Sequence, residues 1–430
     1  MIKLKEHKSL TENKPVEMMS LPPYVYIPLS QHLGKACEPV VKVGDSVFTG
    51  QVIATVQAHV YAPIHSSLSG KVVVIQNWPH PVLGRCKAIV IESDGIDKTQ
   101  DTCLTGRQAG HRTQTEVNKL TPEQIKKIVF EAGIVGLGGA TFPTHIKLTP
   151  PRPVDTLIIN GAECEPYLTC DYRLMIEKTG EILSGLELVA RCLAVKDVYI
   201  AIEDNKPQAI ERFRTQDTRF KIKVLKSAYP QGGERQLIKN ILGKEVPQGK
   251  LPFDIGVVVH NVATIFAIYE AVYMNKPLYE RVVTVTGSCL AAPKNILARI
   301  GTPIKALIDF CGPLLEEPLK IIIGGPMMGI AQYTDQVPVI KSTSGIILFS
   351  QKEFVIRQEE FCIRCGACVR ECPAGLMPCL INLASEREMW QQTKTYGAPD
   401  CMECGLCDFV CPANRRLVQS IKRAKLELAK

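Results

Sequence analysis

Residues 361–373 read FCIRCGACVRECP, and residues 401–412 read CMECGLCDFVCP. Both stretches follow one pattern, C-x-x-C-x-x-C-x-x-x-C-P, so the same spacing occurs twice near the end of the chain. A glycine follows the second cysteine of each run, at Gly366 and Gly405, and permits a tight turn, while the closing proline ends the loop. The repeated pattern predicts two equivalent sites that bind through sulfur.

The spacing is that of bacterial ferredoxins that hold two [4Fe–4S] clusters. In that pattern three cysteines of one run ligate one cluster, and the fourth cysteine ligates the other. We therefore expect two crossed ligand sets, Cys362, Cys365, Cys368 and Cys411 for cluster 1, and Cys372, Cys401, Cys404 and Cys407 for cluster 2. Paired cysteines also bind zinc, but two complete four-cysteine runs without a histidine favour the clusters over zinc or disulfides.

Length and composition indicate a multidomain protein of a reducing compartment. The chain has 430 residues, of which 46% are hydrophobic, so several domains with their own cores are expected. Oxygen-sensitive clusters and scattered further thiols favour the cytoplasm. The N-terminal MIKLKEHKSLTENK lacks the apolar segment of a signal peptide, and the most apolar stretch, residues 255–272, contains polar side chains unsuited to a membrane span.

The formal net charge is +8, and part of it lies in RRLVQSIKRAKLELAK at residues 415–430. We expect a basic helix here, which would suit an anionic membrane surface or an acidic partner. A solvated helix face accounts for the same pattern equally well. The basic stretches lack interleaved aromatic residues, so no nucleic acid is expected as a partner.

The N-terminal part divides into a lead-in and a small β domain. Residues 1–28 are rich in proline and are expected to be poorly ordered. Within residues 29–100, ACEPVVKVGDSVFTGQVIATV (36–56) alternates valine with polar residues and turn signals, which predicts short strands. This pattern resembles the lipoyl-type barrel-sandwich hybrid. Residues 55–63 offer no lysine for a covalent cofactor, so we expect an unmodified, structural domain.

Strand and helix patterns alternate through residues 120–275. Thr121 and Gln124 predict a capping box at the first helix. Further apolar runs predict strands, separated by helices, at 154–162, 196–204, 220–226 and 255–261. Such units form a parallel sheet with helices on both faces, and ligands bind at the carboxyl ends of its strands. Polar residues cluster there together with a glycine-rich loop at 133–148, so we expect one mononucleotide site.

Four motifs in this region resemble the flavin site of the NADH-oxidising flavoprotein subunit of respiratory complex I. In the same order along the chain they are GLGGATFPTHIK (136–147), NGAECEP (160–166), YPQGGER (229–235) and VVHNVAT (258–264). With the lipoyl-like domain before them and the double ferredoxin pattern after them, the chain is similar to the C subunit of the Rnf (Rsx) ion-translocating electron transport complex over residues 25–415.

The resemblance implies non-covalent FMN with an NADH site above it. By motif position, the cofactor contacts would be Gly136, Gly138, Gly139, Lys147, Asn160, Ala162, Glu163, Tyr229, Gly232, His260 and Asn261. Residues in the vicinity of flavin and nicotinamide, which we take as catalytic candidates, would be Phe142, Glu165 and Glu234. The chain departs from the complex I pattern at Leu137, Gly233 and His260, which affects the NADH contacts more than flavin binding.

The implied architecture is multidomain α/β and α+β. Its parts would be a lead-in (1–28), a barrel-sandwich hybrid (29–100), a Rossmann-like FMN/NADH-binding domain (120–275), an SLBB β-grasp unit (276–345) and an α-helical double [4Fe–4S] ferredoxin domain with a basic C-terminal helix (350–430).

The implied function is that of an enzyme subunit in a membrane-bound complex. It would lie peripherally at the cytoplasmic face of the bacterial inner membrane, beside the complex's membrane and iron–sulfur subunits. It would pass electrons between NAD(H), FMN and two [4Fe–4S] clusters, coupled to ion translocation, because a flavin takes electron pairs and clusters carry single electrons. The alternatives are a soluble flavin and iron–sulfur NADH dehydrogenase component feeding another reductase, and a non-enzymatic electron carrier.

Overall fold

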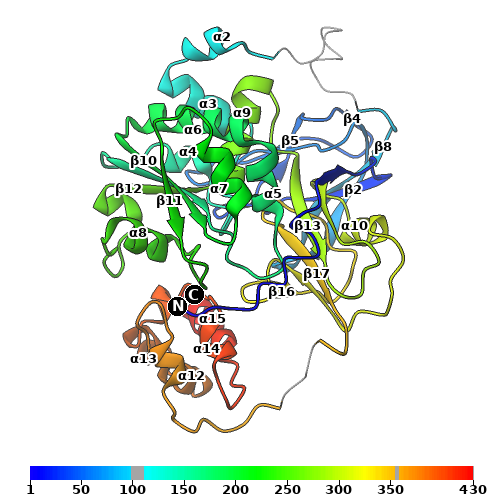
Figure 1. Ribbon diagram of the computed structural model, residues 1–430. Coiled ribbons are helices and arrows are strands. Elements are labelled where there is room, and N and C mark those ends of the chain that lie inside the picture. Colours follow the sequence, from blue (N-terminus) through cyan, green and yellow to red (C-terminus); the bar gives the residue numbers. More distant parts are fainter. Residues whose placement is uncertain (98–110, 354–357, 430) are drawn as a thin grey trace.

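The structure is a computed structural model that describes residues 1–97, 111–353 and 358–429. Four units follow one another along the chain, and the helical C-terminal unit forms a lobe below the rest (Figure 1). Residues 98–110, which include the end of the predicted barrel-sandwich hybrid, residues 354–357 of the predicted ferredoxin domain and Lys430 of the basic helix lie outside the described residues. Among the described helices, none is long and apolar enough to cross a membrane.

The first unit is built from two small antiparallel sheets, with strand orders β2-β8-β7-β4 and β3-β5-β6. Their bounds are β2 Tyr24–Pro28, β3 Glu38–Pro39, β4 Ser46–Val47, β5 Val52–Thr55, β6 Ile64–His65, β7 Gly70–His80 and β8 Gly84–Ser93. Alternating apolar residues of these strands, among them Ile27, Ile53 and Ile89, form a separate buried core. These strands confirm the short strands predicted from the valine alternation.

A parallel sheet with the order β11-β10-β9-β12 forms the centre of the second unit. Its strands are β9 Thr156–Gly161, β10 Asp197–Glu203, β11 Lys221–Leu225 and β12 Val257–Asn261. The helices are α2 Gln114–Asn118, α3 Pro122–Glu131, α4 Thr144–Lys147, α5 Cys170–Glu177, α6 Thr179–Leu193, α7 Pro207–Arg214, α8 Glu234–Leu242 and α9 Val262–Met274, with a 3-10 turn at Pro252–Ile255. The predicted capping box at Thr121 forms.

Helices cover both faces of this sheet, as predicted. Leu157 and Ile159 of β9 pack in one core with α6 and α9, whereas Ile158 packs in another core with α8. This alternation follows from the two-residue period of a strand. The chain runs from β9 through β10 to β11 and then returns to place β12 on the other side of β9, so the strand order reverses between β9 and β12.

A mixed six-stranded sheet, β1-β14-β13-β17-β15-β16, forms the third unit. Its elements are β1 Val16–Met18, β13 Glu280–Thr286, β14 Lys294–Arg299, α10 Ile304–Phe310, β15 Lys320–Ile323, β16 Ile330–Ala331 and β17 Gly345–Phe349. Ile304 and Leu307 of α10 are buried against the sheet. The predicted β-grasp unit thus recruits one strand from the N-terminus of the chain.

The first 28 residues are therefore not the poorly ordered lead-in that their prolines suggested. β1 pairs in parallel with β14, Ile2 forms a β-bridge with Tyr229, and Lys8 is buried. The prediction was wrong because the partners of this segment lie hundreds of residues away, where local composition carries no information about them.

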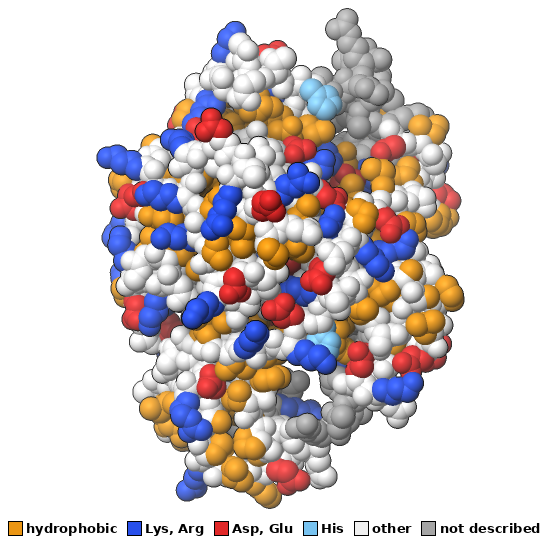
Figure 2. All heavy atoms as spheres, in the orientation of Figure 1, with side chains coloured by type: hydrophobic (Ala, Val, Ile, Leu, Met, Phe, Trp, Pro, Cys, Tyr) orange, Lys and Arg blue, Asp and Glu red, His pale blue; other side chains and the backbone are white. Residues whose placement is uncertain are grey.

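The C-terminal lobe consists of short helices around the cysteine runs. They are α11 Ala367–Arg370, α12 Pro378–Glu386, α13 Trp390–Thr395, α14 Leu406–Phe409 and α15 Leu417–Leu428, with a 3-10 turn at Ala398–Asp400. The basic helix α15 buries Ile421 and Ala424 against the lobe. On the face shown in Figure 2, basic and acidic side chains are interspersed.

Candidate functional site

Two asparagines mark the point where the strand order reverses. Asn160 of β9 and Asn261 of β12 are register partners on neighbouring parallel strands. The Asn261 side chain caps α9 by accepting from Ala263 N at 2.8 Å, and it donates to Asp171 Oδ2 at 2.7 Å. Ligands of open α/β sheets bind beyond the carboxyl ends of the strands at such a reversal. Both asparagines lie at that edge.

The glycine-rich loop lies against Asn261. Gly136 N donates to Phe142 O at 2.9 Å and closes the loop, in which the Phe142 side chain is half-buried. A Cβ atom at Gly138 would lie 2.6 Å from Asn261 Nδ2, so this approach requires glycine. A Cβ atom at Gly139 would meet no atom within 4 Å. The loop therefore offers bare backbone on an open side, which suits a phosphate or a flat ring.

Lys147 connects α4 to the ends of α8 and β12. Its Nζ lies 2.9 Å from Glu234 Oε1 and donates to Val259 O at 3.1 Å. Glu234 is the first residue of α8, where the helix dipole favours a carboxylate. The two side chains are 32% and 38% exposed, so this ion pair remains accessible to a charged ligand.

His260 is buried at the end of β12. Burial lowers the pKa of its imidazole to about 3, and the charge of Lys147 lowers it as well, so the ring is neutral at pH 7. Its Nε2 has no hydrogen-bond partner among the described residues. A buried polar atom without a partner is costly and is usually satisfied by water or a ligand. This nitrogen, the bare glycine loop and the accessible Lys147 are features that fit a polar, anionic cofactor such as FMN.

Asn160 joins the end of β9 to the loop that precedes α8. Its Nδ2 donates to Gly232 O at 2.9 Å, and its Oδ1 accepts from Ala162 N at 3.1 Å. Gly232 N in turn donates to Cys164 Sγ at 3.2 Å. The structure thus brings three residues expected to contact the cofactor into one hydrogen-bonded unit.

The two glutamates of the NGAECEP motif are held by backbone amides. The Glu163 carboxylate accepts from Asp171 N at 2.7 Å at the start of α5. The Glu165 carboxylate accepts from Met327 N at 3.1 Å and Met328 N at 2.8 Å, between β15 and β16. Burial raises the pKa of Glu165 to about 7, and these amides oppose that shift. Glu165 is therefore directed toward the third unit.

The four thiols expected to ligate cluster 2 line one small cavity in the C-terminal lobe. Its lining includes Cys372, Cys401, Cys404 and Cys407 together with apolar residues such as Leu376 and Ile421. Burial, and to a smaller extent the nearby thiols of Cys401 and Cys372, raise the pKa of the Cys404 thiol to about 11. Thiols from both runs therefore meet in one place, and an all-sulfur donor set of four suits a [4Fe–4S] cluster.

The thiols expected for cluster 1 lie in more open surroundings. Cys362 and Cys365 are exposed, whereas Cys368 is buried. The pKa of Cys368 is raised by burial and by the neighbouring thiols of Cys379 and Cys411. The proximity of Cys368 and Cys411 agrees with the crossed ligand set. Cys379, which lies beside Cys368, belongs to neither predicted set.

One packed junction connects the sheet edge with the cluster 2 thiols. The Tyr229 hydroxyl donates to Cys404 O at 2.7 Å and lies 3.4 Å from Glu165 Oε1. A Cβ atom at Gly405 would lie 2.6 Å from Met327 O, so the lobe also fits closely against the third unit. Tyr229, Cys164, Cys404, Met327 and Met402 share one apolar cluster with Ile2 and Leu4.

Sequence reasoning missed the N-terminal residues and the β15–β16 loop at this junction. Lys8 donates to the carbonyls of Glu163, Glu165 and Leu168. The sequence around Lys8 contains no motif that indicates these contacts. Met327 belongs to a pair of methionines that by itself predicts only packing. No local pattern could have identified either residue, because their roles depend on partners far away in the sequence.

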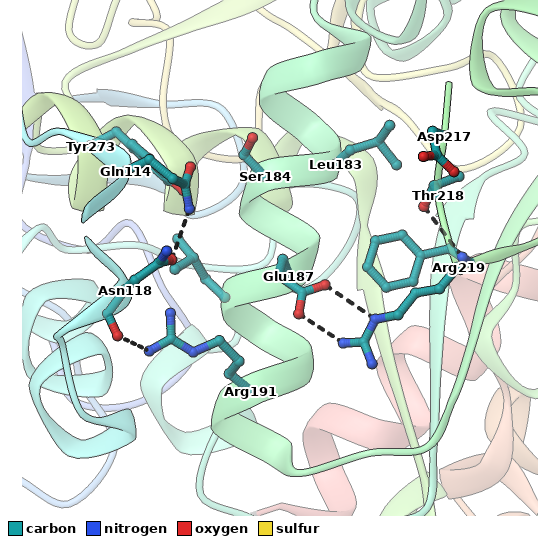
Figure 3. A pocket seen from close by; sticks show the side chains of 12 residues that line it. Gln114, Asn118, Leu183, Ser184, Glu187, Arg191, Asp217, Thr218, Arg219 and Tyr273 are labelled. Carbon is teal, nitrogen blue, oxygen red and sulfur yellow. Dashed lines mark hydrogen bonds and ion pairs between the residues drawn. The ribbon is translucent and has the colours of Figure 1, made fainter. Parts of the chain in front are cut away.

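A cavity of about 680 Å³ lies elsewhere, lined by residues of α2, α6 and α9 and by residues 217–220 that precede β11 (Figure 3). Arg219 pairs with Glu187 across it at 2.8 Å, and Arg191 donates to Asn118 O and Leu120 O. These groups satisfy one another, so we assign no ligand to this cavity.

Comparison with known families agrees with this architecture. Residues 2–96 match the RnfC barrel sandwich hybrid domain, and residues 129–270 match the Nuo51 FMN-binding domain. Residues 282–331 match the SLBB domain, and residues 354–419 match a 4Fe-4S dicluster domain. The second unit is therefore an FMN-binding domain, the third an SLBB domain and the C-terminal lobe a [4Fe–4S] domain.

Relatives match this chain over nearly its whole length. The C subunit of a proton-translocating ferredoxin:NAD(+) oxidoreductase complex of Clostridium ljungdahlii is 45% identical over 98% of this chain and 92% of its own. The C subunit of a Na(+)-translocating ferredoxin:NAD(+) oxidoreductase complex of Acetobacterium woodii is 44% identical over 98% and 94%. The C subunit of an ion-translocating oxidoreductase complex of Rhodobacter capsulatus is 43% identical over 98% and 81%. The chain therefore belongs to the family of Rnf complex C subunits.

Proposed function

We propose that this chain is the NADH- and FMN-binding subunit of an Rnf-type electron transport complex. It passes electrons between NAD(H), FMN and two [4Fe–4S] clusters, to or from partner subunits, in a complex that translocates ions. The observation that carries this proposal is the junction in which Tyr229, beside the FMN-binding edge, donates to the backbone of Cys404. One packed interface thus connects a flavin-type site to a cluster ligand set.

The residues that hold FMN are those gathered at the carboxyl edge of the sheet. The glycine-rich loop and Lys147 receive the phosphate or ring, and Asn160, Gly232, His260 and Asn261 complete the edge. FMN, when bound, supplies the exchange between electron pairs from NADH and single electrons. Phe142 and Glu234 lie where nicotinamide would approach. Glu165 lies between this edge and the β15–β16 loop of the SLBB domain. Its carboxylate therefore stabilises the junction more than it serves nicotinamide binding.

The two clusters occupy a fixed order along the path. Cluster 2, on Cys372, Cys401, Cys404 and Cys407, is next to the FMN-binding domain, because Cys404 contacts Tyr229. Cluster 1, on Cys362, Cys365, Cys368 and Cys411, is next to solvent, because two of its thiols are exposed. Backbone amides donate to three of the ligating sulfurs, at Cys372, Cys401 and Cys411, and such bonds set cluster potentials.

The subunit associates peripherally with the cytoplasmic face of the bacterial inner membrane. This part of the proposal is supported by the helices described here, none of which could span a bilayer, and by relatives named as subunits of ion-translocating complexes. Partner subunits of the complex hold it there, because Lys422, Arg423 and Lys425 of the basic helix α15 already pair with Glu403 and Glu388. The alternative, a soluble NADH dehydrogenase component, predicts no stable association with such subunits.

Anaerobic reconstitution tests the electron path. The chain should bind one FMN and about eight iron atoms, the number in two cubane clusters. In stopped-flow mixing with NADH, the flavin band should bleach before the cluster absorbance. A chain that retains iron but takes up no flavin after reconstitution contradicts the proposal, and clusters that bleach without flavin contradict the order.

A double substitution tests the placement of FMN. Lys147→Ala with Asn261→Ala should abolish stoichiometric flavin while iron stays at about eight per chain. Lys127→Ala, at an exposed position on α3, is the control and should retain flavin. Stoichiometric flavin in the double variant would show that FMN binds elsewhere.

A further inference from the structure

The first residues of the chain form a strap that runs from the cluster 2 junction to the SLBB sheet. We call residues 2–18 the N-terminal strap. It begins at the β-bridge between Ile2 and Tyr229 and ends at β1, which pairs with β14. Figure 1 shows the segment leaving the lobe beside α15 and crossing the molecule toward the sheets. Ile2 and Leu4 pack with Tyr229 and Cys404.

Lys8 is the buried anchor of this strap. Its side chain is 5% exposed, and its Nζ donates to Glu163 O at 2.8 Å, Glu165 O at 3.1 Å and Leu168 O at 2.5 Å. An ammonium group has three donors, and all three are used. The Glu163 carboxylate lies 3.8 Å away and offsets the buried charge. Lysine is rarely buried this deeply, so the position has a specific requirement for a long cation.

The segment that Lys8 holds has an unusual backbone. Glu163 and Tyr167 both adopt positive φ angles, of 46° and 68°, which non-glycine residues seldom do. Such conformations persist only where surrounding contacts impose them. Three carbonyl bonds to one ammonium group are contacts of that kind, and they bind the two ends of the segment together.

The same segment connects the two cofactor sites. On one side, the Glu163 carboxylate fixes Asp171 N, and Asp171 accepts from Asn261 at the FMN-binding edge. On the other side, the Glu165 carboxylate fixes Met327 N, and Met327 lies against Gly405 of the cluster 2 loop. A change in the conformation of the segment would therefore alter both the FMN-binding edge and the cluster 2 loop.

We propose that Lys8 is a positioning residue that sets residues 163–168 and thereby holds the FMN-binding edge and the cluster 2 loop in register. This inference rests on the proposed function, since it assigns a task to Lys8 in the path between FMN and cluster 2. Lys8 acts through the backbone of Glu163, Glu165 and Leu168. It needs no contact with either cofactor.

The test compares Lys8→Met with Lys5→Met in the full chain reconstituted with iron and sulfide. Methionine keeps an unbranched side chain, one atom shorter than that of lysine, but leaves three carbonyls without the ammonium donor. Lys5 is an exposed lysine of the same strap and serves as the matched control. Amide hydrogen exchange is measured in the absence of FMN, so that the first readout does not depend on the cofactor. The affinity for FMN is then measured by quenching of flavin fluorescence.

We expect Lys8→Met to lose exchange protection in residues 161–169 and to bind FMN at least about tenfold more weakly, because hydrogen bonds to a charged group are strong. Iron should stay at about eight per chain. Lys8→Arg keeps the charge and should recover part of the affinity, which loss of general stability would not explain. Lys5→Met should match the unsubstituted chain.

Unchanged protection of this segment, together with FMN affinity within about twofold of the unsubstituted chain, would overturn the proposal, since the expected loss is at least about tenfold. If Lys8→Met fails to fold, Lys8→Arg decides: full affinity and protection in that variant would reduce Lys8 to a general cation in the core, whereas a local loss supports positioning. Failure of the proposed function looks different, because the unsubstituted chain would then bind no FMN at all.

Discussion

The two cysteine runs share one spacing but lie in opposite surroundings. The thiols predicted for cluster 2 line a cavity in the lobe, and the backbone carbonyl of one of these residues, Cys404, accepts from Tyr229 of the FMN-binding domain. The cluster 1 loop carries exposed residues on both sides of its first cysteine, with Phe361 and Ile363 exposed by 89% and 68%. Equal motifs therefore do not imply equal roles. The position of each run relative to the other domains leaves one predicted set of thiols inside the lobe and the other closer to solvent.

The glycine turns of these two runs make the same point at a smaller scale. Gly366 and Gly405 have nearly equal φ angles, of 73° and 79°. A Cβ atom at Gly366 would approach only the flexible end of Arg370, at 3.2 Å, whereas one at Gly405 would lie 2.6 Å from the backbone of Met327. The same glycine serves a turn in one run and both a turn and a domain contact in the other.

The largest expected effect comes from removing one ligand of each cluster. Cys404→Ser and Cys362→Ser should each lower iron from about eight to about four per chain. With cluster 2 absent, NADH should reduce flavin but leave cluster 1 oxidised on the stopped-flow timescale, because electrons reach cluster 1 from flavin through cluster 2. With cluster 1 absent, cluster 2 should still be reduced. Equal loss of cluster reduction in both variants would contradict the order of the clusters.

Alanine at the two turn glycines should separate strain from domain contact. Gly366→Ala should cost about 1 kcal/mol, since a left-handed conformation disfavours a Cβ atom. Gly405→Ala carries that strain and a clash with Met327 O, so the loss should be about 2–4 kcal/mol. Thermal unfolding of the two holoproteins measures the difference. Comparable melting temperatures would show that the lobe does not fit against the SLBB loop as described.

Glu165 should make the stability of the junction depend on pH. Burial raises its pKa from 4.5 to about 7, so the native state holds a proton that the unfolded chain has lost. Its contribution to stability is therefore present below about pH 4.5 and is lost as the pH rises to about 7. Glu165→Gln should flatten thermal stability between about pH 5 and pH 8, while Glu360→Gln, an exposed position near cluster 1, should retain the slope. An unchanged slope in Glu165→Gln would refute this assignment.

The smallest effect is expected from Tyr229→Phe. This change removes one buried hydrogen bond to Cys404 O, which corresponds to about 1 kcal/mol of stability. Flavin and iron should stay bound, and transfer from flavin to cluster 2 should slow modestly. Tyr333→Phe removes a similar bond to Gly84 O at an exposed position and should change neither property. If Tyr333→Phe lowered stability or slowed electron transfer more than Tyr229→Phe, the hydrogen bond at the junction would have no particular importance for either property.

Much of the fold could be predicted because its signals are local. The capping box at Thr121, the strands of the parallel sheet and the alternation in the barrel-sandwich unit all follow from neighbouring residues. The apolar pattern of residues 171–194 forms two helices, α5 and α6, because the helix is interrupted at Lys178. The sequence does not show where a continuous apolar pattern divides into two helices, because the point of division depends on how the helices pack against the sheet.

The sequence by itself predicted which thiols would bind the clusters and which loops form the flavin-type edge. Cysteine spacing and glycine content restrict the local backbone directly, so these assignments need no partner elsewhere. Only the tertiary structure decided that the thiols predicted for cluster 2 lie inside the lobe, that Glu165 is directed to the β15–β16 loop and that Lys8 is part of the junction. These properties arise from contacts between residues far apart in the chain, and burial and hydrogen bonding at such contacts exist only once the domains have packed together.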